Sequence, residues 1–324
     1  MRAVTWRGRN DIAVDDHPDP RIEEPTDAII RVTSTAICGS DLHLLEVLSP
    51  FMDPGDILGH EPMGVVEAVG ASVDRLAPGD RVVVPFNISC GRCWMCQRGL
   101  YAQCETTQVR AHDKGAALFG YSRLYGSVPG GQAEYLRVPH ADFGPIKVRD
   151  DLPDERVLYL SDVLPTAMQA LAYAAVPDGG SLAVVGLGPI GQAVVRIARH
   201  QGIENIIGID RIPERCREAE RHGAQIVRLA ETDAVVDSVQ GMTEGRGTDA
   251  VIDAVGMEAH GSEVVRLMQK ATSLLPPQAA RPVLERVGVD RLAALELALS
   301  LVRRGGTLSI SGVYGGAADP LPMI

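Results

Sequence analysis

The chain has 324 residues, which is long enough for two domains at the usual size of about 100–200 residues each. Its composition, 45% hydrophobic and 23% charged, is typical of a globular protein, and the net charge of −11 argues against a general nucleic-acid-binding surface. No apolar run approaches the roughly 18 residues that span a bilayer, and the N-terminus lacks the apolar core of a signal peptide. We therefore expect a cytoplasmic protein without a membrane partner, whose six cysteines serve as ligands or catalysts rather than as disulfides.

The first 150 residues are predicted to form mostly strands and turns. Four short β-branched runs carry this pattern: 4–6, 28–33, 64–69 and 81–84. Stretches rich in proline and glycine, such as 77–80, separate them. This spacing favours a folded-over, barrel-like β-domain at 1–150, followed by a second domain at 151–324.

The segment 38–61 combines the residue types of a catalytic metal site. It opens with CGSDLH at 38–43 and closes with GHE at 59–61. The thiol of Cys38 and the imidazole of His60 are ligand types that zinc accepts, and Ser40 and His43 could carry protons. Taken alone, either ligand residue could equally be a buried core residue. The motifs elsewhere in the chain favour the metal site.

A second group of cysteines has the spacing of a structural metal site. It consists of four thiols within fifteen positions: Cys90, Cys93, Cys96 and Cys104. Four thiolates satisfy a tetrahedral zinc completely and leave no position for substrate. An iron–sulfur cluster or two disulfides are alternatives, but zinc is favoured in a reducing compartment. We predict a zinc ion that holds a lobe together and does no chemistry.

The second half of the chain contains a dinucleotide-binding pattern. A buried-strand run at 181–185 leads into GLGPIG at 186–191, and apolar residues then recur at helical spacing. A strand, a G-x-G-x-x-G turn and a helix bind dinucleotides because the glycines admit the pyrophosphate to the helix N-terminus. Asp210, about 20 residues after the turn, can accept hydrogen bonds from the adenosine ribose. Its carboxylate would repel a 2′-phosphate, so NAD is favoured over NADP, although Arg211 and Arg215 could tolerate that phosphate.

Alternating strand and helix patterns predict a doubly wound parallel sheet, and the class α/β. The strands are expected at 181–185, 205–209, 225–229, 249–254 and 307–311, with helices at 214–222 and 290–304 between them. A full Rossmann domain has six strands, whereas this pattern has five. The chain therefore looks truncated at its C-terminus.

Together, these motifs resemble the zinc-dependent medium-chain alcohol dehydrogenase family. The matches are CGSDLH at 38–43, GHEPMGVVEAVG at 59–70, PGDRV at 78–82 and the four-cysteine lobe, in the family's order. The resemblance implies a GroES-like β-barrel catalytic domain joined to a Rossmann domain. It also implies that Cys38 and His60 bind the catalytic zinc and that Ser40 and His43 relay the alcohol proton. The family counterpart of Asp41 pairs with a late basic residue, which this chain is expected to lack.

The resemblance also implies a set of cofactor contacts. They are expected at Gly39, Ser40, His43, Thr166, Gly186, Gly188, Ile190, Gly191, Asp210, Arg215, Val255, His260, Gly312 and Val313. Many alcohol dehydrogenases place a pyrophosphate-binding arginine at the position of Gly39, so the backbone or other residues must take that role here.

One branch of the family matches the third ligand position best. Asp162 stands where alcohol dehydrogenases have a cysteine ligand. This substitution, the sequence DAVGMEAHG at 253–261 and an extra segment at 273–288 resemble the glutathione-independent formaldehyde dehydrogenases and dismutases. In that branch the loop after the fourth strand folds over NAD, so His260 is expected to contact the cofactor; a solvated loop residue is the alternative.

The expected function is hydride transfer from an alcohol or a hydrated aldehyde to NAD. Two zinc ions per chain are expected, with Asp162 as the third catalytic ligand and Glu61 behind it as a group that exchanges onto the metal during turnover. A polyol or threonine dehydrogenase is the alternative if Glu61 is the ligand, and a non-catalytic NAD-binding relative is a third. The family also implies a homo-oligomer for the full-length protein. Cys216 fits no ligand set and is expected to be a passive thiol.

Overall fold

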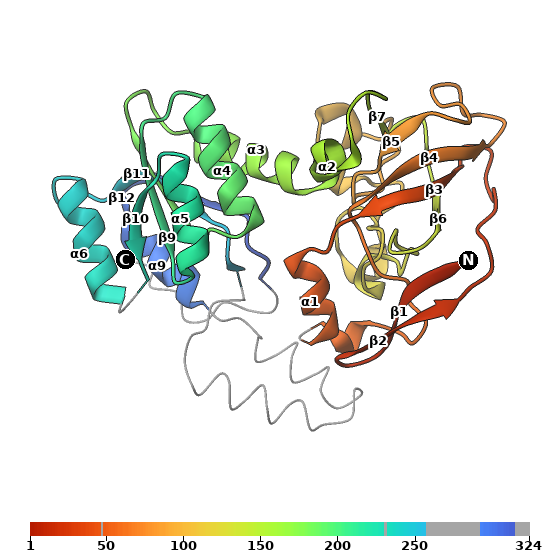
Figure 1. The fold of residues 1–324 in the computed structure, drawn as a ribbon, viewed down its shortest axis with the longest axis horizontal. Helices are drawn as coiled ribbons and strands as arrows, with labels where there is room; N and C mark the ends of the chain where they lie inside the picture. The colour runs from red at the N-terminus through yellow and green to blue at the C-terminus, as the bar shows by residue number, and fades with distance from the viewer. Residues whose placement is uncertain (47, 230–231, 257–291, 315–324) are drawn as a thin grey trace. The chain divides into compact units, whose positions relative to one another are not determined.

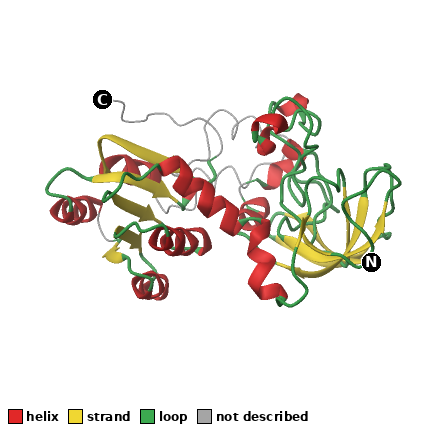
Figure 2. Cartoon of the chain, turned by 90° about the horizontal axis from the view of Figure 1, so that it is seen from above, coloured by secondary structure: helices red, strands yellow, loops and turns green. Residues whose placement is uncertain are grey.

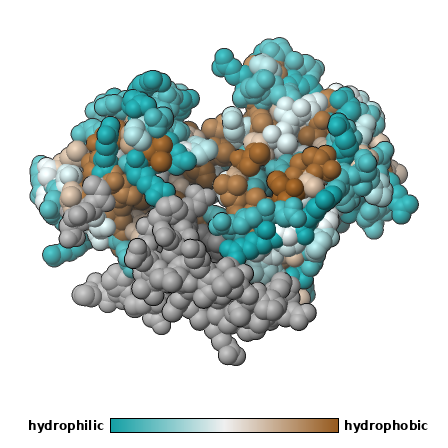
Figure 3. Space-filling view, turned by 60° about the horizontal axis from the view of Figure 1, so that its bottom comes forward, coloured by the Kyte–Doolittle hydropathy of each residue, from teal (hydrophilic) through white to brown (hydrophobic). Residues whose placement is uncertain are grey.

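The computed structural model describes residues 1–46, 48–229, 232–256 and 292–314 (Figure 1). The chain divides into two compact units, Met1–Asp162 and Val163–Ile324, whereas the sequence patterns place the division after residue 150. Within the described ranges, no helix combines the length and the apolar character that crossing a bilayer requires. Hydrophilic side chains cover much of the molecular face in Figure 3, with apolar patches between them.

Unit 1 is built mainly from antiparallel strands. They are β1 (Arg2–Gly8), β2 (Asp11–Asp16), β3 (Ala28–Thr35), β4 (Pro62–Val69), β5 (Arg81–Val83), β6 (Tyr135–Val138) and β7 (Ile146–Lys147). The first two strands form a hairpin, and the other five form one sheet in the order β6-β3-β4-β5-β7. Alternate residues of β3, Ala28 and Ile30, point into a core that also holds Val66 of β4 and Phe119. The strand-rich prediction for this part of the chain is confirmed.

Short helices connect these strands and carry several residues of interest. The α-helices of unit 1 are α1 (Gly39–Leu45) and α2 (Asp154–Val157). The 3-10 helices are η1 (Ser49–Phe51), η2 (Cys96–Arg98), η3 (Tyr101–Gln103), η4 (Arg110–His112), η5 (Arg123–Tyr125) and η6 (Leu158–Ser161).

Unit 2 is a parallel sheet covered by helices on both faces (Figure 2). Its strands are β8 (Ser181–Val185), β9 (Asn205–Asp210), β10 (Gln225–Arg228), β11 (Thr248–Asp253) and β12 (Val302–Ile310). Its helices are α3 (Val163–Ala174), α4 (Pro189–His200), α5 (Pro213–Arg221), α6 (Thr232–Met242) and α9 (Ala293–Leu301). The order β10-β9-β8-β11-β12 confirms the doubly wound arrangement, in which the sheet order reverses between β8 and β11.

The two faces of the parallel sheet explain why its strands read as continuous apolar runs. Leu182 and Val184 of β8 pack into the core that contains residues of α3, α4 and α5. The alternate residues Ala183 and Val185 pack into the core that contains residues of α6 and α9. Because both faces are buried, the four residues that follow Ser181 in this strand are all apolar.

The last strand begins earlier than the sequence predicts. The prediction places a helix at 290–304 and a strand at 307–311, whereas α9 ends at Leu301 and β12 begins at Val302. The register against β11 shifts, because Thr248 pairs with Val302 while Ala250 pairs with Thr307. The two glycines inside this irregular stretch read as a break in the sequence, but the structure accommodates them as a bulge.

Candidate active site and metal centres

Four residues of unit 1 bring potential metal ligands together. Cys38, His60, Glu61 and Asp162 each offer one ligand atom, and these atoms all lie within 4.8 Å of one another. Cys38 precedes α1, His60 and Glu61 precede β4, and Asp162 follows η6. Oδ2 of Asp162 lies 3.8 Å from Sγ of Cys38 and 3.5 Å from Nε2 of His60. The three expected ligands and Glu61 therefore form one cluster.

A bend at Gly59 allows both His60 and Glu61 to reach this cluster. On an extended backbone, adjacent side chains point to opposite sides. Here Gly59 has a φ of +96°, and a Cβ at this position would clash with the side chain of Gln132. The carbonyl of Gly59 accepts a hydrogen bond from the backbone N–H of Gly131 at 2.8 Å. The bend therefore requires glycine and is held by the neighbouring loop.

Asp41 connects two members of the cluster. Its Oδ2 accepts a hydrogen bond from the backbone N–H of Cys38 at 2.9 Å, and its Oδ1 lies 3.3 Å from Nδ1 of His60. The two ring nitrogens of His60 thus face two different carboxylates. The sequence analysis assigned Asp41 to another partner and missed this role. Its position three residues after Cys38, at the start of a helix, is the spacing of a capping box and could have indicated it.

The electrostatics of the cluster are those of a site built for a cation. Glu61 is only 1% exposed, and its Oε1 has no hydrogen-bond partner among the described residues. Burial, together with the negative charge of Asp162, raises the pKa of Glu61 to about 7. Burial also acts to lower the pKa of His60, but hydrogen bonds with Asp162 and Asp41 outweigh it and raise that pKa well above its usual value. A divalent cation bound to these ligands would reverse both shifts, so the cluster fits zinc.

Ser40 and His43, the predicted proton carriers, both lie on α1 next to the cluster. The hydroxyl of Ser40 lies 3.3 Å from Nε2 of His60. His43 is three residues further along the helix, hence on the same side of it, and is only 8% exposed. The structure therefore brings Ser40 to the ligands, while the relay itself stays a prediction.

The four cysteines of the predicted structural site form a second cluster. Their sulfur atoms all lie within 4.8 Å of one another, and all six cysteines of the chain are free thiols. The disulfide alternative is therefore wrong. Backbone N–H groups point at the sulfurs: that of Cys90 donates to Cys104 and that of Cys93 donates to Cys90, each at 3.4 Å. A hydrogen bond from the backbone of Cys96 lowers the pKa of Cys93 to about 6. Groups that stabilise thiolates in this way suit a tetrahedral zinc site.

The glycine-rich turn of unit 2 lies where a dinucleotide would bind. It follows β8 and opens α4, and a Cβ on Gly191 would clash with the carbonyl of Gly186, so helix and turn are in close contact. Gly188 is the N-cap residue of α4, and among the described residues a Cβ on it would meet only Nη1 of Arg215, at 3.9 Å. Ile190 lies in the first turn of this helix. This end of the helix is therefore accessible to a pyrophosphate.

Asp210 lies beside this turn at the end of β9. Its carboxylate accepts hydrogen bonds from the backbone N–H groups of Leu187 at 2.7 Å and Ile212 at 2.8 Å. Nη1 of Arg215 lies 3.8 Å from the same carboxylate. These contacts hold the predicted ribose-binding side chain in place. Cys216, close by on α5, is buried and donates its thiol hydrogen to the carbonyl of Asp210, which agrees with a passive role.

Three of the other predicted cofactor positions of unit 2 lie around a buried carboxylate that the sequence analysis missed. Asp253, at the end of β11, accepts hydrogen bonds from the backbone of Val255 at 2.9 Å and from the hydroxyl of Tyr314 at 2.5 Å. Its carbonyl accepts one from the backbone of Gly312 at 3.0 Å. Val255, Gly312 and Val313 therefore meet at the carboxyl ends of β11 and β12. Thr166 lies on α3, and His260 and the segment 273–288 lie outside the described residues.

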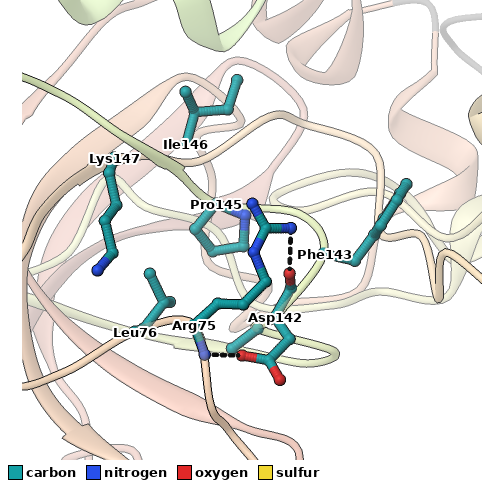
Figure 4. A pocket seen from close by; sticks show the side chains of 8 residues that line it. Arg75, Leu76, Asp142, Phe143, Pro145, Ile146 and Lys147 are labelled. Atoms are coloured by element: carbon teal, nitrogen blue, oxygen red, sulfur yellow. Dashed lines mark hydrogen bonds between the residues drawn. The ribbon is translucent and has the colours of Figure 1, made fainter.

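A surface pocket of about 500 Å³ in unit 1 contains none of these residues (Figure 4). Its two cations already have partners: Arg75 donates to the carbonyl of Asp142, and Lys147 lies 2.7 Å from Asp80. The pocket therefore has no evident part in the chemistry of the metal cluster.

Two protein-family models match this chain. Residues 24–148 match the alcohol dehydrogenase GroES-like domain, and residues 189–276 match the zinc-binding dehydrogenase domain. An uncharacterized zinc-type alcohol dehydrogenase-like protein of Bacillus subtilis, AdhB, is 40% identical over 328 residues, covering 100% of this chain and 82% of the relative. The glutathione-independent formaldehyde dehydrogenase of Pseudomonas aeruginosa is 32% identical over 323 residues, covering 95% of this chain and 80% of the relative.

The solved structures agree with the sequence comparisons. Alcohol dehydrogenase TADH from Thermus sp. ATN1 superposes with a TM-score of 0.81 at 36% identity, covering 100% of this chain and 80% of the other. The predicted combination of a GroES-like domain and a Rossmann sheet is thereby confirmed. The chain belongs to the zinc-type medium-chain alcohol dehydrogenase family.

Proposed function

We propose that the protein is a zinc- and NAD-dependent oxidoreductase that removes a hydride from a small alcohol or a hydrated aldehyde such as that of formaldehyde. The observation that carries this proposal is the cluster of Cys38, His60, Glu61 and Asp162, whose ligand atoms lie within 4.8 Å of one another. A thiolate, an imidazole and a carboxylate are three ligands that leave a fourth position on zinc for a substrate oxygen.

Cys38, His60 and Asp162 would hold the catalytic zinc, which when bound supplies a Lewis acid that polarises the substrate oxygen and lowers its pKa. Glu61 would lie behind these ligands and exchange with one of them during turnover; its buried, unpartnered Oε1 supports this role. Ser40 would accept the proton of the substrate hydroxyl, and His43 would pass that proton towards solvent, a role suited to an imidazole.

The N-terminus of α4 would hold the pyrophosphate of the cofactor, and the carboxylate of Asp210 would accept hydrogen bonds from the hydroxyls of the adenosine ribose. The fixed carboxylate of Asp210 disfavours a 2′-phosphate and supports NAD over NADP. Arg215 would contact the adenosine half, and Val255, Gly312 and Val313 would line the carboxyl end of the sheet. We also expect His260 to contact the cofactor.

The choice of substrate rests on the third ligand. An aspartate at position 162 and the resemblance to a formaldehyde dehydrogenase at 32% identity support formaldehyde and short alcohols. Glu61 lies in the same cluster, and this observation favours a polyol or threonine dehydrogenase as the second candidate.

The experiment is to follow NAD reduction with formaldehyde, short alcohols, polyols and threonine in parallel, with an NADP series beside it and zinc measured per chain. We expect turnover with formaldehyde or short alcohols and a preference for NAD. Faster turnover of a polyol or threonine would support the second candidate. A protein that holds both zinc ions but turns over none of these compounds would contradict the proposal.

A further inference from the structure

Two aromatic rings pack against the imidazole of His60. The ring of Phe86 lies edge to face with it, at 6.3 Å between centroids and 81° between planes. The ring of Tyr121 is arranged in the same way, at 6.2 Å and 79°. Such edge-to-face pairs are directional, because the positive edge of one ring meets the negative face of the other. The two rings therefore restrict the rotation of the imidazole as well as its position.

Tyr121 is itself held firmly by an apolar core. It is only 8% exposed and belongs to a cluster with Trp6, Leu44, Met52 and Leu58. Its ring also packs edge to face on Tyr125, with 5.4 Å between the centroids. Because protein cores are close-packed, the ring of Tyr121 cannot shift without displacing these neighbours.

The backbone ties Tyr121 to the bend that aims His60. Gly120, directly before Tyr121, has a φ of +57°, and a Cβ on this residue would clash with the backbone of Gly59. The segments 59–60 and 120–121 are therefore in direct contact both through their backbones and through their rings.

We propose that Tyr121 is a positioning residue that, together with Phe86, orients His60 and thereby sets the zinc affinity of the catalytic cluster. The ring of Tyr121 keeps Nε2 of His60 turned towards Asp162, 3.5 Å away, while Nδ1 faces Asp41. Without that ring the imidazole samples other rotamers, and the ligand must be ordered again each time the metal binds. The proposal rests on the assignment of His60 as a zinc ligand in the proposed function.

The ring rather than the hydroxyl carries this role, because the contact with His60 joins the two ring systems. Burial raises the pKa of Tyr121 above its usual value. The phenol therefore stays neutral at physiological pH and brings no charge to the cluster. Phenylalanine at this position should therefore orient His60 as tyrosine does.

The test compares Tyr121→Leu, Tyr121→Phe and the matched control Tyr125→Leu. Tyr125 belongs to the same apolar surroundings and packs on Tyr121, but among the described residues no ring contact joins it to His60. Each protein is loaded with cadmium-113, whose resonance distinguishes the four-cysteine site from the mixed-ligand site, and zinc affinity is measured by competition with a chelator. We expect Tyr121→Leu to move or broaden the mixed-ligand resonance, to leave the four-cysteine resonance in place and to weaken zinc binding about tenfold.

Tyr121→Phe should keep both the resonance and the affinity of the parent, and Tyr125→Leu, which leaves the ring of Tyr121 against His60, should change both much less than Tyr121→Leu does. Equal effects of Tyr121→Leu and Tyr125→Leu would overturn the proposal, because they would reflect general loss of packing. An effect of Tyr121→Phe as large as that of Tyr121→Leu would overturn it too. If Tyr121→Leu does not fold, Phe86→Leu removes the second ring that packs on His60, at a half-buried position, and should also weaken zinc binding. Unchanged zinc binding in Phe86→Leu would then contradict the proposal. If the parent protein shows no mixed-ligand resonance, the catalytic cluster binds no metal, and the proposed function itself is contradicted.

Discussion

Oδ1 of Asp41 lies 3.3 Å from Nδ1 of His60, on the side of the imidazole that faces away from Asp162. The other oxygen of Asp41 holds the backbone N–H of Cys38. A carboxylate in this position fixes the tautomer and the orientation of a metal-binding histidine.

Asp41→Asn should therefore weaken binding of the catalytic zinc by about 10–100-fold. The amide keeps the shape of the carboxylate but loses the negative charge that faces Nδ1 of the imidazole. Zinc affinity measured by chelator competition checks this expectation. Asp53→Asn, which removes a charge that pairs with Arg123, is the control and should leave affinity unchanged. Equal affinity in Asp41→Asn and the parent would remove Asp41 from the site.

The two carboxylates of the cluster can be separated by substitution. Asp162→Asn should lose the catalytic zinc and nearly all turnover, whereas Glu61→Gln should keep the zinc and lose part of the turnover. Asp162→Cys should keep the metal in the manner of other alcohol dehydrogenases. Zinc per chain, measured beside turnover, shows which of the two carboxylates is the third zinc ligand. The assignment fails if Asp162→Asn keeps both zinc ions while Glu61→Gln loses one.

Zinc binding should depend on pH through the groups that must lose a proton. In the metal-free protein the pKa of His60 is raised well above its usual value and that of Glu61 is raised to about 7. Each group carries a proton when the pH lies below its own pKa. His60 must be deprotonated to bind zinc, and Glu61 must be deprotonated to exchange onto it; binding therefore releases protons. Zinc affinity should therefore fall as the pH drops through the raised pKa of His60. Calorimetry in two buffers of different ionisation enthalpy measures the released protons, and the same heat in both buffers would contradict this expectation.

The cofactor preference should depend on Asp210. Asp210→Ser should raise the KM for NAD about tenfold, since a charged hydrogen-bond acceptor to the ribose is lost, and should improve the relative use of NADP. Because Asp210 also holds the backbone of Leu187, thermal unfolding of the variant should be recorded to separate binding from folding. An unchanged ratio of NAD to NADP use in a folded variant would rule out the assignment.

Local patterns predicted the parts of the fold in which each segment follows its own periodicity. The buried strand β8 and the glycine-rich turn after it were placed correctly, because a strand buried on both faces gives a continuous apolar run, here at 182–185. The four cysteines were grouped correctly because their ligand spacing is local.

Features that depend on contacts between distant segments were not predictable in this way. The start of β12 depends on its register against β11, and the hydroxyl of Tyr314 reaches Asp253 across 61 residues of sequence. The role of Tyr121 depends on a ring contact with a residue of another segment. The side-chain patterns of these residues are equally compatible with ordinary core packing.

The most direct measurement of the central claim is zinc per chain and turnover in three cysteine variants. Cys38→Ala should hold one zinc fewer and lose turnover, because the catalytic cluster loses its thiolate ligand. Cys96→Ala should also hold one zinc fewer, but from the four-cysteine site, and should unfold more readily because that metal supplies folding energy to its lobe. Cys216→Ala should keep both zinc ions and turnover. The account predicts this pattern; a Cys38→Ala variant that keeps both zinc ions and full turnover would contradict it.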